Sequence, residues 1–107
     1  MEINQYSIVL VNLDPTFGSE IKKNRPCVII SPDVMNKHLD TIVLAPMTTN
    51  LKRYPTRVAV DHDGKKGMIM IDQIRTVDKK RVMQVLGMLT KSEIKNCKDI
   101  IKETFVD

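Results

Sequence analysis

Short runs of β-branched and aliphatic residues, each stopped by proline, glycine or polar residues, fill the first three quarters of the chain. Runs of this length and composition predict strands. Strands are expected at 7–13, 26–31, 41–45, 57–61, 68–71 and 82–89, with residues 73–77 leading to a helical turn at 78–81. Pro46 has no N–H to donate, so the third strand is expected to end before it. The runs at 57–61 and 68–71 flank an Asp-Gly turn and predict a hairpin.

The last quarter of the chain predicts a helix. Thr90-Lys-Ser-Glu93 fits a capping box, and Ile94, Cys97, Ile101 and Phe105 recur every three or four residues. A short helical turn is expected from Ser31 to Asn36, because proline suits the first helical position. This order of elements predicts a mainly β fold, a barrel or sheet with helices packed outside, in a single domain over residues 1–107.

Three of the expected strands are apolar at consecutive positions, namely 28–30, 42–45 and 68–71. A strand with one face in water alternates, so these strands are expected to bury both faces. Two explanations are open at this point. The strands are either central in a closed barrel, or they are covered by a symmetric homodimer in which Met68 and Met70 fill the interface.

Composition excludes several classes of protein. Hydrophobic residues make up 42% and charged residues 28% of the chain, which excludes a disordered chain. Two cysteines and two histidines without ligand spacing argue against a structural zinc site, and we expect neither metal nor cofactor. Both cysteines are expected to be buried thiols, and with no leader-like or membrane-spanning segment they favour the cytosol. A net charge of +4 favours a polyanion or an acidic partner.

Known catalytic motifs are absent from the sequence: it has no Walker loop, GxSxG or HExxH. His38 and His62 lie in polar, loop-like stretches and are expected to be ordinary surface histidines, so a two-histidine ribonuclease is not expected. The residues Lys52, Arg53 and Arg57 around Tyr54-Pro55 are also expected at the surface, where such a basic rim could hold phosphates.

Polar residues that end apolar strands are the better candidates for chemistry, because a rigid sheet fixes side chains at strand ends. Arg25 precedes the second strand, Thr48 and Thr49 follow the third, and Asp72-Gln73 follow the fifth. A guanidinium matches phosphate geometry, and a hydroxyl can donate to a second phosphate oxygen. These residues suggest a phosphate site. The alternative is that Arg25 forms a structural salt bridge and the threonines only shape a turn.

At these residues the sequence resembles the MazF/PemK family of toxin endoribonucleases. The matching segments stand in family order: Val11-Asn-Leu-Asp-Pro-Thr-Phe-Gly-Ser-Glu20, Arg25-Pro26 with Val28-Ile-Ile-Ser-Pro32, Ala45-Pro-Met-Thr-Thr49, Tyr54-Pro-Thr-Arg57 and Asp72-Gln-Ile-Arg-Thr-Val-Asp78. The resemblance spans nearly the whole chain. It implies a dimeric SH3-like barrel of the CcdB/MazF/PemK type with a C-terminal helix.

The resemblance also implies an activity and partners. Members of this family are mRNA interferases, which cut single-stranded RNA at short sequences without a metal and leave 2′,3′-cyclic phosphate and 5′-hydroxyl ends. An antitoxin with an acidic, disordered tail neutralises them. The implied catalytic residues are Arg25 and Thr48, and the implied RNA-binding residues are Phe17, Ser19 and Glu20 along the groove, with Asp72 and Gln73 at its floor.

The resemblance leaves the proton-transfer groups open. Some relatives have His where Ser19 stands and Arg where Met70 stands, so a mechanism built on those groups does not transfer. A guanidinium with a pKa above about 12 is a poor base. Glu20 or Asp72 could be the base, or either could orient Arg25.

Two rival functions remain. A CcdB-type toxin binds DNA gyrase without enzymatic activity, but it depends on a hydrophobic C-terminal end, whereas this chain ends with Lys102-Glu-Thr-Phe-Val-Asp107. The other rival is a catalytically dead RNA-binding member of the MazF/PemK family.

Overall fold

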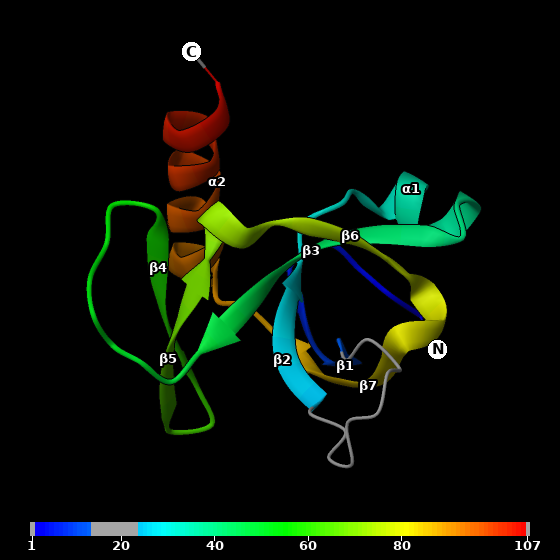
Figure 1. Cartoon of the computed structure of the whole chain (residues 1–107), viewed down its shortest axis with the longest axis horizontal. Coiled ribbons are helices and arrows are strands. Elements are labelled where there is room, and N and C mark those ends of the chain that lie inside the picture. The colour runs from blue at the N-terminus through cyan, green and yellow to red at the C-terminus, as the bar shows by residue number, and fades with distance from the viewer. Residues whose placement is uncertain (1, 14–23, 107) are drawn as a thin grey trace.

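An antiparallel sheet curls around the core, and one long helix stands against one end of it (Figure 1). The computed structural model describes residues 2–13 and 24–106. The elements in chain order are β1 (Ser7–Asn12), β2 (Asn24–Ile29), α1 (Asp33–His38), β3 (Thr41–Thr48), β4 (Arg57–His62), β5 (Lys65–Met70), the 3-10 turn η1 (Ile71–Gln73), β6 (Arg75–Asp78), the 3-10 turn η2 (Lys79–Arg81), β7 (Val82–Met88) and α2 (Lys91–Phe105). The expected mainly β fold with a C-terminal helix is confirmed.

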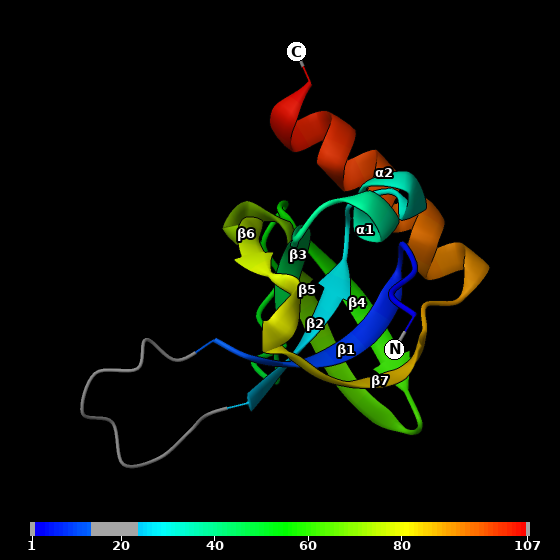
Figure 2. The same cartoon turned by 90° about the vertical axis from the view of Figure 1, so that its right-hand side faces the viewer.

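The strands pair in the order β4-β5-β3-β2-β1-β7, and β6 pairs separately with β3. Figure 2 shows β1 and β7 crossing one side of the molecule, with the β4–β5 hairpin behind them. In the described part of the chain, β4 and β7 end the strand path without pairing with each other. The sheet is therefore a half-barrel, open between these two strands.

The third strand changes its partner part-way along. Its pairing with β2 ends at the Cys27–Pro46 pair, and beyond it Met47 and Thr48 pair with Ile69 and Met68 of β5. The ladder with β2 thus stops at Pro46, although the missing N–H is not the cause, because Ile30 N donates to Val43 O and alternate residues of β3 face β2. The expectation that the strand itself ends at Ala45 is wrong, because β5 takes over as the partner and carries β3 on to Thr48.

Two apolar clusters fill the fold, one on each side of β1 and β2. The first contains Ile8, Val28 and Ile69 and packs against α2, and the second contains Val9, Cys27 and Leu44. Neighbours along β1 and β2 thus fall into different clusters, which explains why consecutive residues in these strands are apolar.

Met68 and Met70 do not fill a subunit interface. Their side chains are only 5% and 4% exposed within a single chain, so the expectation that they cover a homodimer interface is wrong. Met68, Ile69 and Met70 are all buried within one chain, so both faces of β5 are covered over this part of the strand. A second copy is not needed to explain the two-faced apolar strands.

The β4–β5 hairpin is confirmed and is longer than expected, since it reaches His62 and Lys65. Its two-residue turn is Asp63-Gly64, with φ of 51° and 77°. Positive φ at both positions defines a type I′ turn, and Asn/Asp-Gly is the pair that this turn favours.

The N-terminus of α2 is anchored by one carboxylate. The capping box is confirmed: Glu93 N donates to Thr90 Oγ1 (3.2 Å) and Thr90 N donates to Glu93 Oε1 (2.9 Å). The second oxygen, Oε2, accepts from the backbone N–H of Asp61 on β4 (2.9 Å). Glu93 is buried, so it joins the helix cap to the outer strand of the sheet. Of the predicted apolar face, Cys97 is buried while Phe105 is 58% exposed.

We expect Glu93→Ala to lower the free energy of unfolding by about 2 kcal/mol, because it removes a helix cap and leaves a strand N–H without its acceptor. Urea denaturation followed by circular dichroism measures this. Glu103→Ala, at an exposed position of the same helix, is the control and should leave stability unchanged. Equal stability of both variants would contradict the anchoring role.

The two cysteines are buried free thiols, as expected. Burial raises the pKa of the Cys27 thiol to about 12, although the Arg25 and Arg75 charges lower it in part. Burial, aided by the Glu93 charge, raises the pKa of the Cys97 thiol to about 12 as well. An unfolded thiol ionises near pH 8.5, so between about pH 8.5 and 12 the unfolded state holds fewer protons than the folded state.

We therefore expect stability to fall as the pH rises through this window, and to be unaffected by the thiols below it. Urea midpoints measured under reducing conditions at neutral and alkaline pH test this. Cys27→Ala and Cys97→Ala should each flatten the alkaline decline relative to the unsubstituted chain. An identical decline in all three proteins would show that the thiols do not titrate in this way.

Candidate nucleic-acid interface

An open groove of about 740 Å³ runs between the β4–β5 hairpin and the strands β1, β2 and β7. It lies where β3 leaves β2 for β5, so the divergence of these strands opens it. Its lining residues are Ile8, Leu10, Asn24, Arg25, Pro26, Met47, Thr48, Thr49, His62, Asp63, Lys65, Lys66, Gly67 and Leu86. The described lining residues therefore come from β1, β2, β3, β4, β5 and β7, and from the connections that follow β3 and β4.

Arg25 and Thr48, the two predicted catalytic residues, both line this groove. The last β2–β3 pair is Cys27–Pro46, and continuing that register by two residues would set Arg25 opposite Thr48. At that point Thr48 pairs instead with Met68 of β5. The two side chains consequently stand at the edges of the gap that the departing strand leaves. The structure brings this predicted pair together in an accessible place.

The groove combines an apolar floor with a cationic rim. Ile8, Leu10, Pro26, Met47 and Leu86 contribute apolar surface to it. Among the described lining residues, Arg25, Lys65 and Lys66 contribute positive charge and Asp63 contributes the one carboxylate. Cations attract the phosphates of a nucleic acid, and apolar surface favours unstacked bases.

The hydroxyl of Thr48 has a defined orientation. Its Oγ1 accepts a hydrogen bond from the backbone N–H of Asn50 (3.2 Å). The hydroxyl proton is therefore available to an acceptor outside the chain, such as a phosphate oxygen. Gly67 of β5 lets the two strands approach closely at Thr48, since a Cβ at residue 67 would lie 3.0 Å from the Thr48 carbonyl oxygen.

The predicted loop residues Phe17, Ser19 and Glu20 lie outside the residues that the structure describes. Asp72 and Gln73 are described, but the described residues that line the groove do not include them. They lie in η1, at the end of β5 away from the hairpin turn. Their role in binding RNA stays a prediction.

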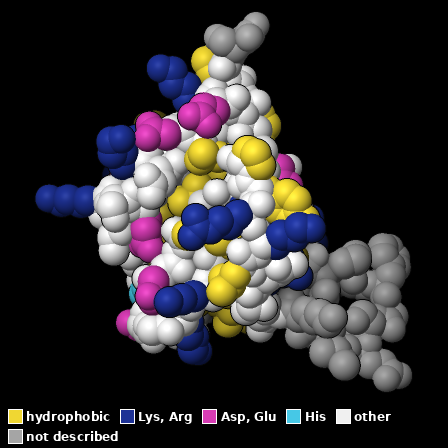
Figure 3. All heavy atoms as spheres, turned by 90° about the vertical axis from the view of Figure 1, so that its left-hand side faces the viewer, with side chains coloured by type: hydrophobic (Ala, Val, Ile, Leu, Met, Phe, Trp, Pro, Cys, Tyr) yellow, Lys and Arg dark blue, Asp and Glu magenta, His cyan; other side chains and the backbone are white. Residues whose placement is uncertain are grey.

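Asp72 belongs to a polar cluster beside the β3–β4 connection. Its Oδ1 accepts from Thr56 Oγ1 (3.0 Å) and lies 3.9 Å from Arg57 Nε. The Arg57 guanidinium carbon lies 4.5 Å from the centre of the Tyr54 ring. Leu51 and Tyr54 are exposed in the same connection. On the face that Figure 3 shows, hydrophobic side chains gather among lysines and arginines. Lys52, Arg53 and Arg57 were expected to form a basic rim at the surface, but the Arg57 side chain is mostly buried.

His62 is not the ordinary surface histidine that the sequence predicted. Its side chain is 28% exposed, lines the groove, and its Nε2 lies 3.3 Å from the carbonyl oxygen of Leu86. The sequence around His62 gave little indication of a role in the groove, because the neighbours Asp61 and Asp63 are typical of a solvated turn. Lys65 and Lys66 were missed for the same reason, since only the fold brings the hairpin turn to Arg25.

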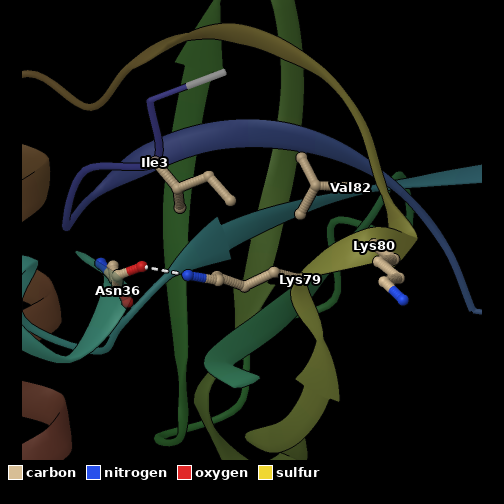
Figure 4. A pocket seen from close by; sticks show the side chains of 5 residues that line it. All are labelled: Ile3, Asn36, Lys79, Lys80 and Val82. Carbon is tan, nitrogen blue, oxygen red and sulfur yellow. Dashed lines mark hydrogen bonds between the residues drawn. The ribbon is translucent and has the colours of Figure 1, made fainter. Parts of the chain in front are cut away.

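A second, smaller pocket of about 240 Å³ contains none of the predicted site residues. Ile3, Asn36, Lys79, Lys80 and Val82 line it (Figure 4). Lys79 Nζ donates to the backbone oxygen of Asn36 (2.8 Å) and so ties η2 to α1. Lys79 is thus occupied in a structural contact, whereas Lys80 adds a second positive charge to this pocket.

No group of three or more His, Cys, Asp or Glu side chains that could hold a metal occurs in residues 2–13 and 24–106. In the same part of the chain, no helix has the length and apolar character needed to cross a membrane.

Solved structures share this fold. A MazE–MazF complex from Deinococcus radiodurans is similar with a TM-score of 0.83 and 23% identity, over 96% of this chain and 95% of that chain. An endoribonuclease in complex with its cognate antitoxin, from a mycobacterial species, is similar with a TM-score of 0.79 and 22% identity, over 94% and 92%. The half-barrel with its C-terminal helix is thus the fold of MazF toxins.

Sequence comparison then gives the family. The family model described as PemK-like, MazF-like toxin of type II toxin–antitoxin system matches residues 4–105. A protein of Staphylococcus epidermidis named Endoribonuclease MazF is 36% identical, over 92% of this chain and 89% of that protein. The chain belongs to the PemK/MazF toxin family.

Proposed function

We propose that this protein is a sequence-specific endoribonuclease toxin that cuts single-stranded RNA without a metal and is neutralised by a cognate antitoxin. Membership of the PemK/MazF family, and the relative named Endoribonuclease MazF, support endoribonuclease activity. The observation that carries the proposal is the position of Arg25 and Thr48 at the edges of one open, cationic groove.

The proposed reaction is a transesterification at one phosphodiester. The ribose 2′-oxygen attacks the adjacent phosphorus and loses its proton, the bond to the 5′-oxygen breaks, and that oxygen gains a proton. The products are a 2′,3′-cyclic phosphate and a 5′-hydroxyl. Atoms and charge balance without a metal or cofactor, provided that the negative charge on the phosphorane is stabilised.

Arg25 and Thr48 supply that stabilisation. The guanidinium donates a fork of N–H groups to two phosphate oxygens. The Thr48 hydroxyl, which accepts from Asn50 N and keeps its own proton, donates to a phosphate oxygen. Preorganised donors of this kind each contribute about 2.7–4 kcal/mol to the transition state, or about 10²–10³ in rate.

Sequence selectivity would come from unpaired bases, since the apolar floor contacts base faces and edges that a duplex hides. Phe17 remains the predicted stacking surface. Structured RNA should therefore resist cleavage. Because mRNA is the expected substrate, we expect the activity in the cytoplasm.

Two protein partners complete the proposal. A homodimer is expected from the family. An antitoxin with an acidic, partly apolar tail would match the cationic rim and apolar floor of the groove, and would compete with RNA for both. The two structural relatives described as complexes with MazE or a cognate antitoxin support this expectation.

The test is incubation of the purified protein with a long natural RNA in EDTA, followed by mapping of the 5′ ends. Cleavage at a short recurrent sequence supports the enzyme. RNA that is bound but intact would instead support the catalytically dead RNA-binding alternative. Neither binding nor cleavage, together with inhibition of gyrase, would support the CcdB-like alternative.

Arg25→Ala and Thr48→Val test the catalytic pair directly. Each should lower the cleavage rate by about 10²-fold or more, because each removes a donor to the charged phosphorane. Lys98→Ala and Thr76→Val, at exposed positions outside the groove, are the controls and should cleave normally. Circular dichroism checks that all four variants fold. Wild-type cleavage by Arg25→Ala would overturn the assignment.

A further inference from the structure

The turn of the β4–β5 hairpin, residues His62–Lys66, forms a wall of the groove. We call this segment the hairpin tip. It belongs to the β4–β5 arm of the sheet, whereas β1, β2 and β7 form the other walls. In the described residues, no strand pairing joins the two arms at this point, so the position of the tip depends on side-chain contacts.

One imidazole holds the tip against β7. His62 Nε2 lies 3.3 Å from the Leu86 carbonyl oxygen and 3.4 Å from Asp63 Oδ2. Both partners can only accept, so Nε2 carries the proton and donates. The contact thus joins the end of β4 to β7, the two strands that leave the half-barrel open.

The strand β7 is shaped to receive this ring. Ile8 pairs with Gly87 and Val9 pairs with Val85, so Leu86 is the extra residue of a β-bulge. A bulge releases a residue from the regular ladder and re-aims it, which leaves the Leu86 carbonyl to His62. A Cβ at residue 87 would lie 2.4 Å from His62 Cε1, so glycine is required for this close approach.

The tip presents two exposed lysines, Lys65 and Lys66, to the groove. Neither takes part in an ion pair with the described residues. Thr48 pairs with Met68, and Lys66 lies two residues further along β5, which is about 7 Å at 3.4 Å per residue. The lysines are therefore offset along the groove from the threonine that would contact the scissile phosphate.

We propose that the hairpin tip is a second phosphate-binding subsite, which holds the RNA backbone beside the scissile phosphate. The proposal rests on the proposed function, in which the occupant of the groove is single-stranded RNA. Lys65 and Lys66 are the binding groups, and His62 is a positioning residue that acts through them. The contact of His62 with Leu86 and Gly87, which we call the His62 contact site, fixes the distance between this subsite and the Arg25–Thr48 pair.

The salt dependence of binding tests the lysines. The probe is a fluorescein-labelled RNA containing the mapped cleavage sequence, with a 2′-O-methyl group on the attacking nucleotide so that it stays intact. Two lost phosphate contacts should lower the slope of log affinity against log salt by about 1.4, at about 0.7 per contact. Lys65→Ala with Lys66→Ala should show this loss. Lys98→Ala with Lys102→Ala carries the same change of charge on exposed α2 and should keep the original slope.

The His62 contact site is tested separately with Gly87→Ala, which would displace the His62 ring. We expect it to weaken binding of the same RNA and reduce the slope in the same direction as the lysine variant. His62→Ala should behave likewise, and His62→Gln, whose amide can donate to Leu86, should recover part of the loss. Thermal melts establish that each variant is folded under the binding conditions.

The outcomes separate this proposal from the function on which it rests. If the unsubstituted protein neither binds nor cuts RNA, the proposed function fails and the subsite fails with it. If the unsubstituted protein cuts RNA but the tip and α2 double variants have equal slopes, the subsite is overturned while the endoribonuclease stands.

Discussion

The whole site depends on one backbone constraint, the change of partner of β3 at Pro46. The β2–β3 ladder stops at the Cys27–Pro46 pair. The strand then continues with β5 as its partner, and Arg25 and Thr48 are left at the two sides of a gap. A continuous ladder would close that gap. The point at which β3 changes its partner therefore determines where the molecule can admit a ligand.

The rest of the fold holds the two walls of the gap at a fixed separation. Glu93 ties the helix cap to β4 at Asp61, and His62, the next residue, contacts the bulge of β7. These two polar contacts position the hairpin where β4 and β7 lack a shared ladder. Because both depend on buried or half-buried hydrogen bonds, each is costly to lose. The sheet thus stays open at the groove without its arms separating.

Local patterns in the sequence were sufficient to predict the strands, the Asp-Gly hairpin turn and the capping box, because each depends on residues close together in the chain. The pairing of Arg25 with Thr48 came from the family resemblance, and the structure brings the two residues to one groove. The strand end at Ala45 was misplaced because β3 takes β5 as a second partner after Pro46, which local sequence does not indicate. Of the two explanations left open for the apolar strands, the one in which Met68 and Met70 fill a homodimer interface fails, because a single chain already buries both side chains.

The importance of His62 could not be predicted, since it depends on a glycine and a bulge more than twenty residues away in the chain.

The most direct test of the central claim is a crystal structure with an RNA that carries a 2′-O-methyl group at the attacking position. The account predicts one phosphate within hydrogen-bond distance of both the Arg25 guanidinium and Thr48 Oγ1. A phosphate backbone that crosses another face, or that touches only one of the two residues, would contradict it.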